Sequence, residues 1–336
     1  MLNKLEILLQ PQAYPHRTQD IKLLQTQMSF VFLTGDFAYK VKKPVDLGYL
    51  DYTTLEKRRF FCDQELELNR RLCPDAYLAV VPIVEYRDEL HVEGGGNVVE
   101  YAVKMRQLPP DRMMDVLLPR SRVSKEMIAD VARKLVDFHD RAKTNAAIAA
   151  FGNQAVIRQN ANENFTQTAK YVGVSISPAG YERIKRHTNA FIDSNSGLFG
   201  ERVQEGKIRD CHGDLHAAHI CFTDAICIYD CIEFNDRFRY CDVASEIAFL
   251  AMDLDRHGQA DLSTHFVNTY VELSGDDGIS RLLQFYKCYR AYVRGKVESF
   301  KLDDRYLTDE DKAKALAAAK RYFELAESYI PKEVAS

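Results

Sequence analysis

The sequence predicts an α+β protein built from two parts, a β-rich N-terminal part and a mainly helical C-terminal part. Short segments rich in β-branched and aromatic residues dominate the first hundred residues, whereas apolar residues at helical spacing dominate the remainder. Pro109 and Pro110 end the last expected strand, so we place the boundary near residue 108. The expected domains are therefore 1–108 and 109–336, and 336 residues are enough for both.

The amino-acid composition argues against a nucleic acid or a membrane as the partner of this protein. The chain is 46% hydrophobic and 28% charged, as in ordinary globular proteins, and its net charge of -4 offers no basic surface to a nucleic acid. No apolar run approaches the length of about 18 residues that a membrane span needs, and the N-terminus lacks the apolar core of a signal peptide. We therefore expect a cytoplasmic protein that binds neither nucleic acid nor membrane.

The eight cysteines do not indicate a disulfide framework or a zinc site. No pair has CxxC spacing, and a chain of this length does not need covalent cross-links to form a stable core. We expect reduced, partly buried thiols.

Three strands are expected at the start of the chain, over 21–27, 29–35 and 37–44. Gly35 and Asp36 separate the last two by the two residues of a tight hairpin. Further strands are expected over 79–86 and 97–110.

A helix is expected over 53–72, where Thr53 and Glu56 have the spacing of a capping box. Phe61, Leu68 and Leu72 form one apolar stripe, and Glu65 occupies the position that completes it. Two interpretations are open: Glu65 reaches water at the edge of the stripe, or it is buried beside a cation. Burial without a partner is costly, and the strand FAYKVKK offers lysines.

The second part should contain helices over 124–142, 154–171, 180–195, 242–258, 279–300 and 309–330. Two short strands, over 219–223 and 225–230, interrupt this helical pattern.

The segment DCHGDLHAAHI, residues 210–220, precedes these short strands and has three possible functions. His212, Asp214, His216 and His219 could hold a metal, but no companion cluster of ligands is evident elsewhere. A nucleophile relay through Cys211 lacks a GxSxG elbow. A phosphotransfer loop requires a base, a metal-binding carboxylate after a strand and a lysine–carboxylate pair, and Asp214, Asp230 and Lys40 with Glu65 supply them in order.

HGDLHAAHI, followed by IYDCIEFN, resembles the catalytic core of the aminoglycoside phosphotransferase family, whose typical loop reads HGDLHPGNI. The segments 29–72 and 230–254 look closer still to a bacterial subgroup of kinase-like proteins. The resemblance covers nearly the whole chain and implies a bilobal protein-kinase-like fold. Proteins of that subgroup are often fused to a P-loop ATPase domain, which is a possible partner here since the chain has no GxxxxGK[ST] motif.

The resemblance implies a phosphotransferase that uses ATP and Mg²⁺ and has a small-molecule hydroxyl as acceptor. Asp214 matches the catalytic aspartate, and His212 supports the loop as the first residue of its motif. Asp230 matches the Mg²⁺-binding aspartate, and Glu233 is expected to assist it. His219 replaces the usual metal-binding Asn, and imidazole is a poorer Mg²⁺ ligand than an amide oxygen.

The resemblance also implies the nucleotide-binding residues. Lys40 should contact the phosphates and pair with Glu65, and Lys42 is the alternative lysine because strand alternation puts it on the same face. Without a GxGxxG motif, the turn TQMS should cover the phosphates, through its backbone and the hydroxyls of Thr26 and Ser29. Backbone groups in the segment of Met105, Gln107 and Leu108 should pair with adenine.

Two further expectations concern specificity and activity. Acidic residues of the helical part, namely Asp236, Asp253 and Asp255, would favour a cationic or polyhydroxylated acceptor, although solvated helix faces explain them equally well. The substitution at His219 motivates a second hypothesis, a nucleotide-binding regulatory module with little catalysis.

Overall fold

The computed structural model describes residues 6–87, 89–304 and 307–331. The chain divides into two compact units, the first comprising Met1–Val116 with Ala218–Arg239 and the second Leu117–Ala217 with Tyr240–Ser336. The first unit thus takes in a segment from within the range 109–336 that we assigned to the second domain. Each unit has its own core.

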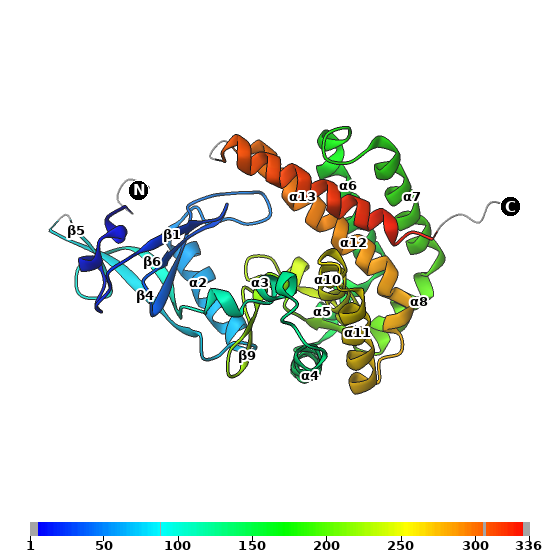
Figure 1. Cartoon of the computed structure of the whole chain (residues 1–336), viewed down its shortest axis with the longest axis horizontal. Helices are drawn as coiled ribbons and strands as arrows, with labels where there is room; N and C mark the ends of the chain where they lie inside the picture. The colour runs from blue at the N-terminus through cyan, green and yellow to red at the C-terminus, as the bar shows by residue number, and fades with distance from the viewer. Residues whose placement is uncertain (1–5, 88, 305–306, 332–336) are drawn as a thin grey trace. The chain divides into compact units, whose positions relative to one another are not determined.

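The first unit is built on a six-stranded antiparallel sheet with the order β1-β2-β3-β6-β4-β5 (Figure 1). Its strands are β1 (Lys22–Gln25), β2 (Ser29–Leu33), β3 (Phe37–Lys42), β4 (Tyr77–Tyr86), β5 (Glu89–Val92) and β6 (Asn97–Arg106). The predicted hairpin between β2 and β3 is confirmed: Thr34 donates its N–H to the Phe37 carbonyl at 2.8 Å, and Gly35 has a φ of +96°. Sequence analysis missed β5, which is only four residues long.

Helix α2 (Leu55–Arg70) packs on β6 and β4 of this sheet. Its N-cap is Thr54, whose hydroxyl accepts the Lys57 N–H at 3.3 Å, so the predicted cap at Thr53 was wrong by one residue. The Thr53 hydroxyl instead donates to Asp51 at 2.6 Å. Alternation along β3 turns Tyr39 and Val41 into the apolar core, which leaves the opposite face to lysines.

The segment 218–239 joins the first unit through a small apolar cluster and a covalent link. Its hairpin of β8 (Ile220–Phe222) and β9 (Ile226–Ile228) supplies two cysteines that pack with Cys62, Tyr77 and Val103. Cys227 forms a disulfide with Cys73, which follows α2, with Cα atoms 4.7 Å apart. The expectation that all cysteines are reduced was therefore wrong for this pair, because the fold brings together residues separated by 154 positions.

The second unit is mainly helical (Figure 1). Its longer helices are α4 (Lys125–Arg141), α6 (Gln154–Thr168), α7 (Pro178–Ser194), α8 (Ser196–Gln204), α10 (Val243–Arg256), α11 (Ala260–Ser274), α12 (Ile279–Phe300) and α13 (Asp309–Ser328). The six predicted helices are present, and α8 and α11 were missed. The second unit also contains the short helix α5 (Ala146–Ala149) and the strand pair β7 (Ile208–Asp210) and β10 (Tyr240–Asp242). The short helix α9 (Asp236–Arg239) belongs to the first unit, and α3 (Met114–Leu117) lies where the chain passes from the first unit to the second.

Helix α10 is the centre of the second unit. Every residue from Val243 to Leu254 is buried, including Glu246 and Asp253. A buried carboxylate requires hydrogen-bonding partners, so these two acids mark polar contacts inside the helical core. Within the described ranges, no helix has the length and apolar character needed to cross a membrane.

The disulfide gives a direct test of the first unit. Of the eight cysteines, we expect six to react with iodoacetamide in unfolded, unreduced protein and eight after reduction, as counted by mass spectrometry. Reduction should lower the free energy of unfolding by about 2–5 kcal/mol, because the bridge closes a long loop. A Cys73→Ser/Cys227→Ser variant should show no effect of reduction. Eight reactive thiols without reduction would contradict the bridge.

Candidate functional site

A cluster of charged side chains lies between β3 and α2 in the first unit. Lys40 extends from β3, and its Nζ lies 2.8 Å from Glu65 Oε1 and 2.5 Å from Asp230 Oδ1. Glu65 is 0% exposed, which decides between the two interpretations of the apolar stripe: the carboxylate is buried beside a cation. The predicted Lys40–Glu65 pair is present.

A second lysine lies deeper in the same cluster. Lys42 is 1% exposed, and its Nζ lies 2.7 Å from Glu65 Oε2. It also donates a short hydrogen bond to Glu233 Oε1, and the Tyr52 hydroxyl donates to that same oxygen at 2.6 Å. Glu65 therefore lies between two ammonium groups, one partly accessible and one fully buried.

The pKa values of Lys40 and Glu65 are shifted in the directions that favour their charged forms. Burial alone lowers the pKa of Lys40, but the carboxylates of Asp230, Glu65 and Glu233 raise it well above its ordinary value. Burial likewise opposes the ionised form of Glu65, yet Lys40 and Lys42 hold its pKa below the usual value. The site is therefore a set of ion pairs at neutral pH.

Asp230 is held in an unusual backbone conformation by side chains of α2 and β4. Its φ is +63°, a left-handed value that is uncommon outside glycine. Its N–H donates to the Tyr77 hydroxyl at 3.2 Å, and the next N–H, of Cys231, donates to Asn69 Oδ1 at 2.9 Å. The turn after β9 thus fixes the direction of the Asp230 carboxylate.

The donor set around Asp230 fits a hard cation. The carboxylate is 39% exposed, and one of its oxygens already faces the ammonium of Lys40, so positive charge is stabilised here. His219 Nε2 lies 3.5 Å from the other oxygen, Oδ2. Glu233 is 8% exposed and its Oε1 binds Lys42 and Tyr52, so coordination by Glu233 would require it to leave them. The roles of the three residues as metal ligands stay predictions.

The turn between β1 and β2 is closed by its own polar groups. Thr26 accepts the Ser29 N–H at 2.9 Å and the Met28 N–H at 3.2 Å through its hydroxyl, and its own N–H donates to the Ser29 carbonyl at 3.0 Å. Ser29 is 2% exposed. Thr26 and Ser29 therefore maintain the turn, and their contact with phosphates stays a prediction.

The segment after β6 is partly engaged within the first unit. Gln107 donates its N–H to the Asp36 carbonyl at 2.9 Å, and its side chain accepts the Gly35 N–H at 3.2 Å. Met105 is paired in the sheet with Ala38, and Leu108 packs against the apolar cluster of Cys62 and Tyr77. Adenine contacts in this segment stay a prediction, for which the N–H of Leu108 is the best candidate, because the Gln107 N–H is already used.

In the second unit, the loop that carries Asp214 is anchored to the buried carboxylate of Glu246. Its Oε1 accepts the N–H groups of His212 and Gly213, each at 2.7 Å. The other oxygen, Oε2, lies 2.7 Å from His139 Nε2. Burial raises the pKa of Glu246, but the hydrogen bond from His139 and the neighbouring charges lower it from 4.5 to about 2.

The histidines of the loop have distinct positions. His212 is fully buried, and its Nδ1 accepts the Asp214 N–H at 3.3 Å, which agrees with a supporting function. His216 is 6% exposed, packs on the Phe249 ring and lies 3.6 Å from Asp214 Oδ2. Asp214 remains the more accessible of the three, and its function as a base stays a prediction.

A cluster of His139, Cys211 and Glu246 has the composition of a metal site, but its polar atoms are already engaged. His139 bonds to Glu246 and to the Tyr270 hydroxyl, each at 2.7 Å, and Cys211 donates to the Cys241 carbonyl at 3.5 Å. We assign this cluster a structural function.

The three acids expected to attract a cationic acceptor have partners within the protein. Asp253 accepts the Ala217 N–H at 2.9 Å, Asp255 binds Lys287 at 2.8 Å, and Asp236 binds Arg239 at 2.6 Å. Asp253 and Asp255 are therefore largely enclosed, whereas Asp236 remains exposed beside Arg239.

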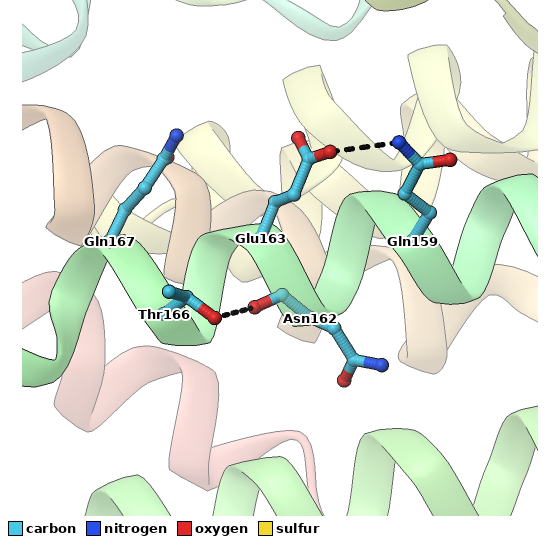
Figure 2. A pocket seen from close by; sticks show the side chains of 5 residues that line it. All are labelled: Gln159, Asn162, Glu163, Thr166 and Gln167. Carbon is cyan, nitrogen blue, oxygen red and sulfur yellow. Dashed lines mark hydrogen bonds between the residues drawn. The ribbon is translucent and has the colours of Figure 1, made fainter.

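A hollow of about 450 Å³ lies along α6 (Figure 2). Figure 2 shows that its polar lining bonds along the helix itself: Gln159 donates to Glu163 at 2.9 Å, and Thr166 donates to the Asn162 carbonyl at 3.0 Å. The lining side chains, Gln159, Asn162, Glu163, Thr166 and Gln167, come from a single helix, and we assign the hollow no function.

Sequence analysis missed the supporting residues Tyr52, His139 and Glu246. Glu246 had a visible signal, since it interrupts the apolar run of α10 as Glu65 interrupts that of α2. Tyr52 and His139 had none, because aromatic residues and histidines are common in apolar segments.

Comparison with known proteins identifies the fold. The chain is 32% identical over 311 residues to uncharacterised proteins of Mycobacterium tuberculosis and Mycobacterium bovis, which covers 92% of this chain. It spans 60% of the length of those relatives. Among solved structures, the choline kinase LicA from Streptococcus pneumoniae aligns with a TM-score of 0.50 and 12% identity over 96% of both chains. No protein-family model matches. The chain therefore shares the protein-kinase-like fold of that structure.

Because Lys42 is more deeply buried than Lys40, substitution of the two lysines should lower the free energy of unfolding by different amounts. Lys42→Met should lower the free energy of unfolding in urea by about 3–5 kcal/mol, because it leaves Glu233 buried without its cation and Glu65 with Lys40 alone. Lys40→Met should cost less than half as much, because Lys42 still neutralises Glu65 and Asp230 reaches water. Adding Glu233→Gln should recover part of the Lys42→Met loss; equal costs for the two lysines would refute this difference.

The lowered pKa of Glu246 predicts acid sensitivity of the second unit. A carboxylate whose folded pKa is depressed from 4.5 to about 2 contributes stability that is present above pH 4.5 and is lost as pH falls toward 2. Glu246→Gln should therefore be less stable than the wild type at pH 7, and the difference should shrink across this window. Denaturant unfolding at several pH values measures it. A constant difference would show that ionisation of Glu246 is irrelevant.

Proposed function

We propose that the chain is an ATP- and Mg²⁺-dependent phosphotransferase that acts on a hydroxyl of a small molecule. The observation that carries the proposal is the position of Lys40, whose Nζ lies 2.8 Å from buried Glu65 and 2.5 Å from Asp230. A lysine directed by one carboxylate and facing a second, partly exposed carboxylate suits the phosphates of a nucleotide and their cation. The protein-kinase-like fold of the chain adds support.

In the proposed ground state, Lys40 turns from Asp230 to the nucleotide phosphates while Glu65 keeps hold of it. The carboxylate of Asp230 would hold Mg²⁺, which when bound would neutralise charge on the phosphate oxygens. His219 lies close enough to Asp230 to donate a hydrogen bond to its carboxylate or to a phosphate oxygen.

Asp214 is the proposed base of the second unit. It orients the acceptor hydroxyl, whose oxygen forms a bond to the γ-phosphorus as the bond between that phosphorus and the ADP oxygen breaks. The hydroxyl proton passes to the Asp214 carboxylate. Hydrogen bonds from the N–H groups of His212 and Gly213 to Glu246 hold the loop that carries Asp214 in position.

A nucleotide-binding module with little catalysis is the second candidate, and His219 is the observation that favours it. Imidazole is a weak ligand for Mg²⁺, so a site with His219 would bind ATP with little dependence on the metal. This candidate predicts no phosphate transfer above that of Asp214→Asn.

The proposal also includes a cellular location and a protein partner. A cytoplasmic location provides the ATP, although the Cys73–Cys227 disulfide is unusual in that compartment. A P-loop ATPase partner, as in the resembling subgroup, also stays a proposal.

Calorimetric titration of ATP with and without Mg²⁺ tests the two candidates. We expect Mg²⁺ to strengthen ATP binding at least tenfold in the wild type and to have no effect in Asp230→Ala, because that change removes the proposed metal ligand. Glu65→Gln should weaken binding far more than Glu67→Gln, the matched change at an exposed site of α2. Binding that ignores both Mg²⁺ and Asp230→Ala would reject the phosphotransferase in favour of the binding module.

A further inference from the structure

Helix α12 carries a row of cations on a face that packs into the second unit. Lys287, Arg290 and Arg294 follow one another at steps of three and four residues, so they lie along one face. Lys287 and Arg290 are each 7% exposed, and the Arg294 side chain is 21% exposed. Cations placed this deeply need partners.

Lys287 has a carboxylate partner, and Arg290 does not. Lys287 Nζ lies 2.8 Å from Asp255 Oδ2. Arg290 instead donates to neutral oxygens, those of Ser245 at 3.1 and 3.3 Å and the Gly213 carbonyl at 3.2 Å. Across the described ranges, no carboxylate lies within ion-pair distance of Arg290. Arg290 thus holds the residue that precedes Asp214 through a neutral oxygen.

Among the described residues, Arg294 and Arg256 lack a close carboxylate partner that is not shared with another group. The carboxylate near Arg294 is Glu298, at 3.7 Å, and both oxygens of Glu298 accept hydrogen bonds from Lys301 at 2.9 Å. Arg256, the last residue of α10, has only His257 Nε2 at 3.4 Å as a polar partner among the described residues. The Nε atoms of both arginines are buried and make no hydrogen bond in the described structure.

The two guanidinium groups converge on one aromatic ring. The central carbon of Arg256 lies 4.7 Å from the centre of the Tyr322 ring, and that of Arg294 lies 5.7 Å from it. Like charges on one ring repel each other, and Asp253, which is close to Tyr322, is shared with the Ala217 N–H. A further anion between the arginines would relieve this repulsion.

Arg294 lies on the same helix as Arg290, which binds the loop of the proposed base. Arg290 anchors Gly213, and Arg294 follows one turn later on the same helix. Burial alone lowers the pKa of Arg294, but Tyr322, Asp214 and Asp253 raise it above the ordinary value, which agrees with a position near Asp214. A substrate whose hydroxyl meets Asp214 would therefore bring its neighbouring groups to Arg294.

We propose that Arg294 and Arg256 bind an oxyanion group, a carboxylate or a phosphate ester, on the molecule whose hydroxyl is phosphorylated. This inference rests on the proposed phosphotransferase and names its substrate class. Two guanidinium forks suit planar carboxylate or tetrahedral phosphate oxygens, and they disfavour cationic amino sugars and quaternary amines. The acids expected to attract a cationic acceptor, Asp236, Asp253 and Asp255, already bind other groups of the protein.

The first test is transfer from ATP to acceptors matched in pairs, glycerol with glycerate and with glycerol 3-phosphate, and glucose with glucose 6-phosphate and with glucosamine. We expect the anionic members to be preferred at least tenfold in kcat/KM. Arg294→Met and Arg256→Met should each raise the KM for the anionic acceptor about ten- to a hundredfold, in line with loss of a charge-assisted hydrogen bond. Arg281→Met, an exposed arginine of α12 paired with Glu201, should change nothing.

Direct binding supplies a second arm that does not depend on turnover. Inorganic phosphate, titrated calorimetrically without nucleotide, should bind the wild type and Arg281→Met at least fivefold more tightly than Arg294→Met. Arg294→Lys keeps the charge and should recover part of the affinity, which separates recognition from a folding defect. Equal phosphate affinity in the wild type and Arg294→Met would overturn the inference.

The experiments can reject the oxyanion site and the phosphotransferase separately. Mg²⁺-dependent ATP binding with transfer that favours neutral or cationic acceptors would overturn the anion site and leave the phosphotransferase intact. Loss of ATP binding in the wild type would reject the phosphotransferase, while a phosphate affinity that depends on Arg294 would still support an oxyanion site.

Discussion

The buried carboxylate of Glu65 is the constraint on which the first unit depends. It lies on the face of α2 that packs against the sheet, where an unpaired negative charge would be strongly destabilising. Lys40 and Lys42 both satisfy it, and because they come from one strand they fix the register of α2 against β3. Arg58 and Glu100, a second buried pair between α2 and β6, hold the start of the same helix.

Lys40 and Lys42 both bind Glu65, but they have different functions in the cluster. Lys42 is enclosed with Tyr52 and Glu233, so it can neutralise Glu65 permanently. Lys40 remains partly accessible and faces Asp230. It is therefore able to exchange one anionic partner for another without leaving a buried charge unpaired, which is what phosphate binding requires. Glu233 also belongs to the segment of Asp230, so Lys42 links the strand, the helix and the turn that carries Asp230.

Much of this was readable from the sequence because the physical signals were local. Glu65 interrupts an apolar stripe, and alternation along β3 places both lysines on one face. Strand alternation does not say how deeply a side chain is buried. The difference in burial between Lys40 and Lys42 therefore required the packed structure. The helix α11 was readable in principle, since Leu262, Phe266 and Tyr270 have helical spacing.

Other features depend on contacts between distant segments. Nothing in the spacing of Cys73 and Cys227 indicates a bridge, because only the packing of β8 and β9 on the end of α2 brings them together. The approach of Arg256 and Arg294 has the same origin, since the Tyr322 ring on which they converge lies on a third helix, α13. Thr26 and Ser29 illustrate the opposite case: polar residues in a turn suggested ligand contacts, and the structure uses them to close the turn.

The central claim is that Lys40, and not Lys42, faces the nucleotide. The most direct measurement is covalent labelling with an ATP derivative that carries a reactive acyl phosphate at its terminal phosphate, followed by peptide mass spectrometry. The account predicts that Lys40 is acylated, that excess ATP with Mg²⁺ blocks the reaction, and that Lys42 is unmodified. Labelling of Lys42, or labelling elsewhere that ATP does not block, would contradict it.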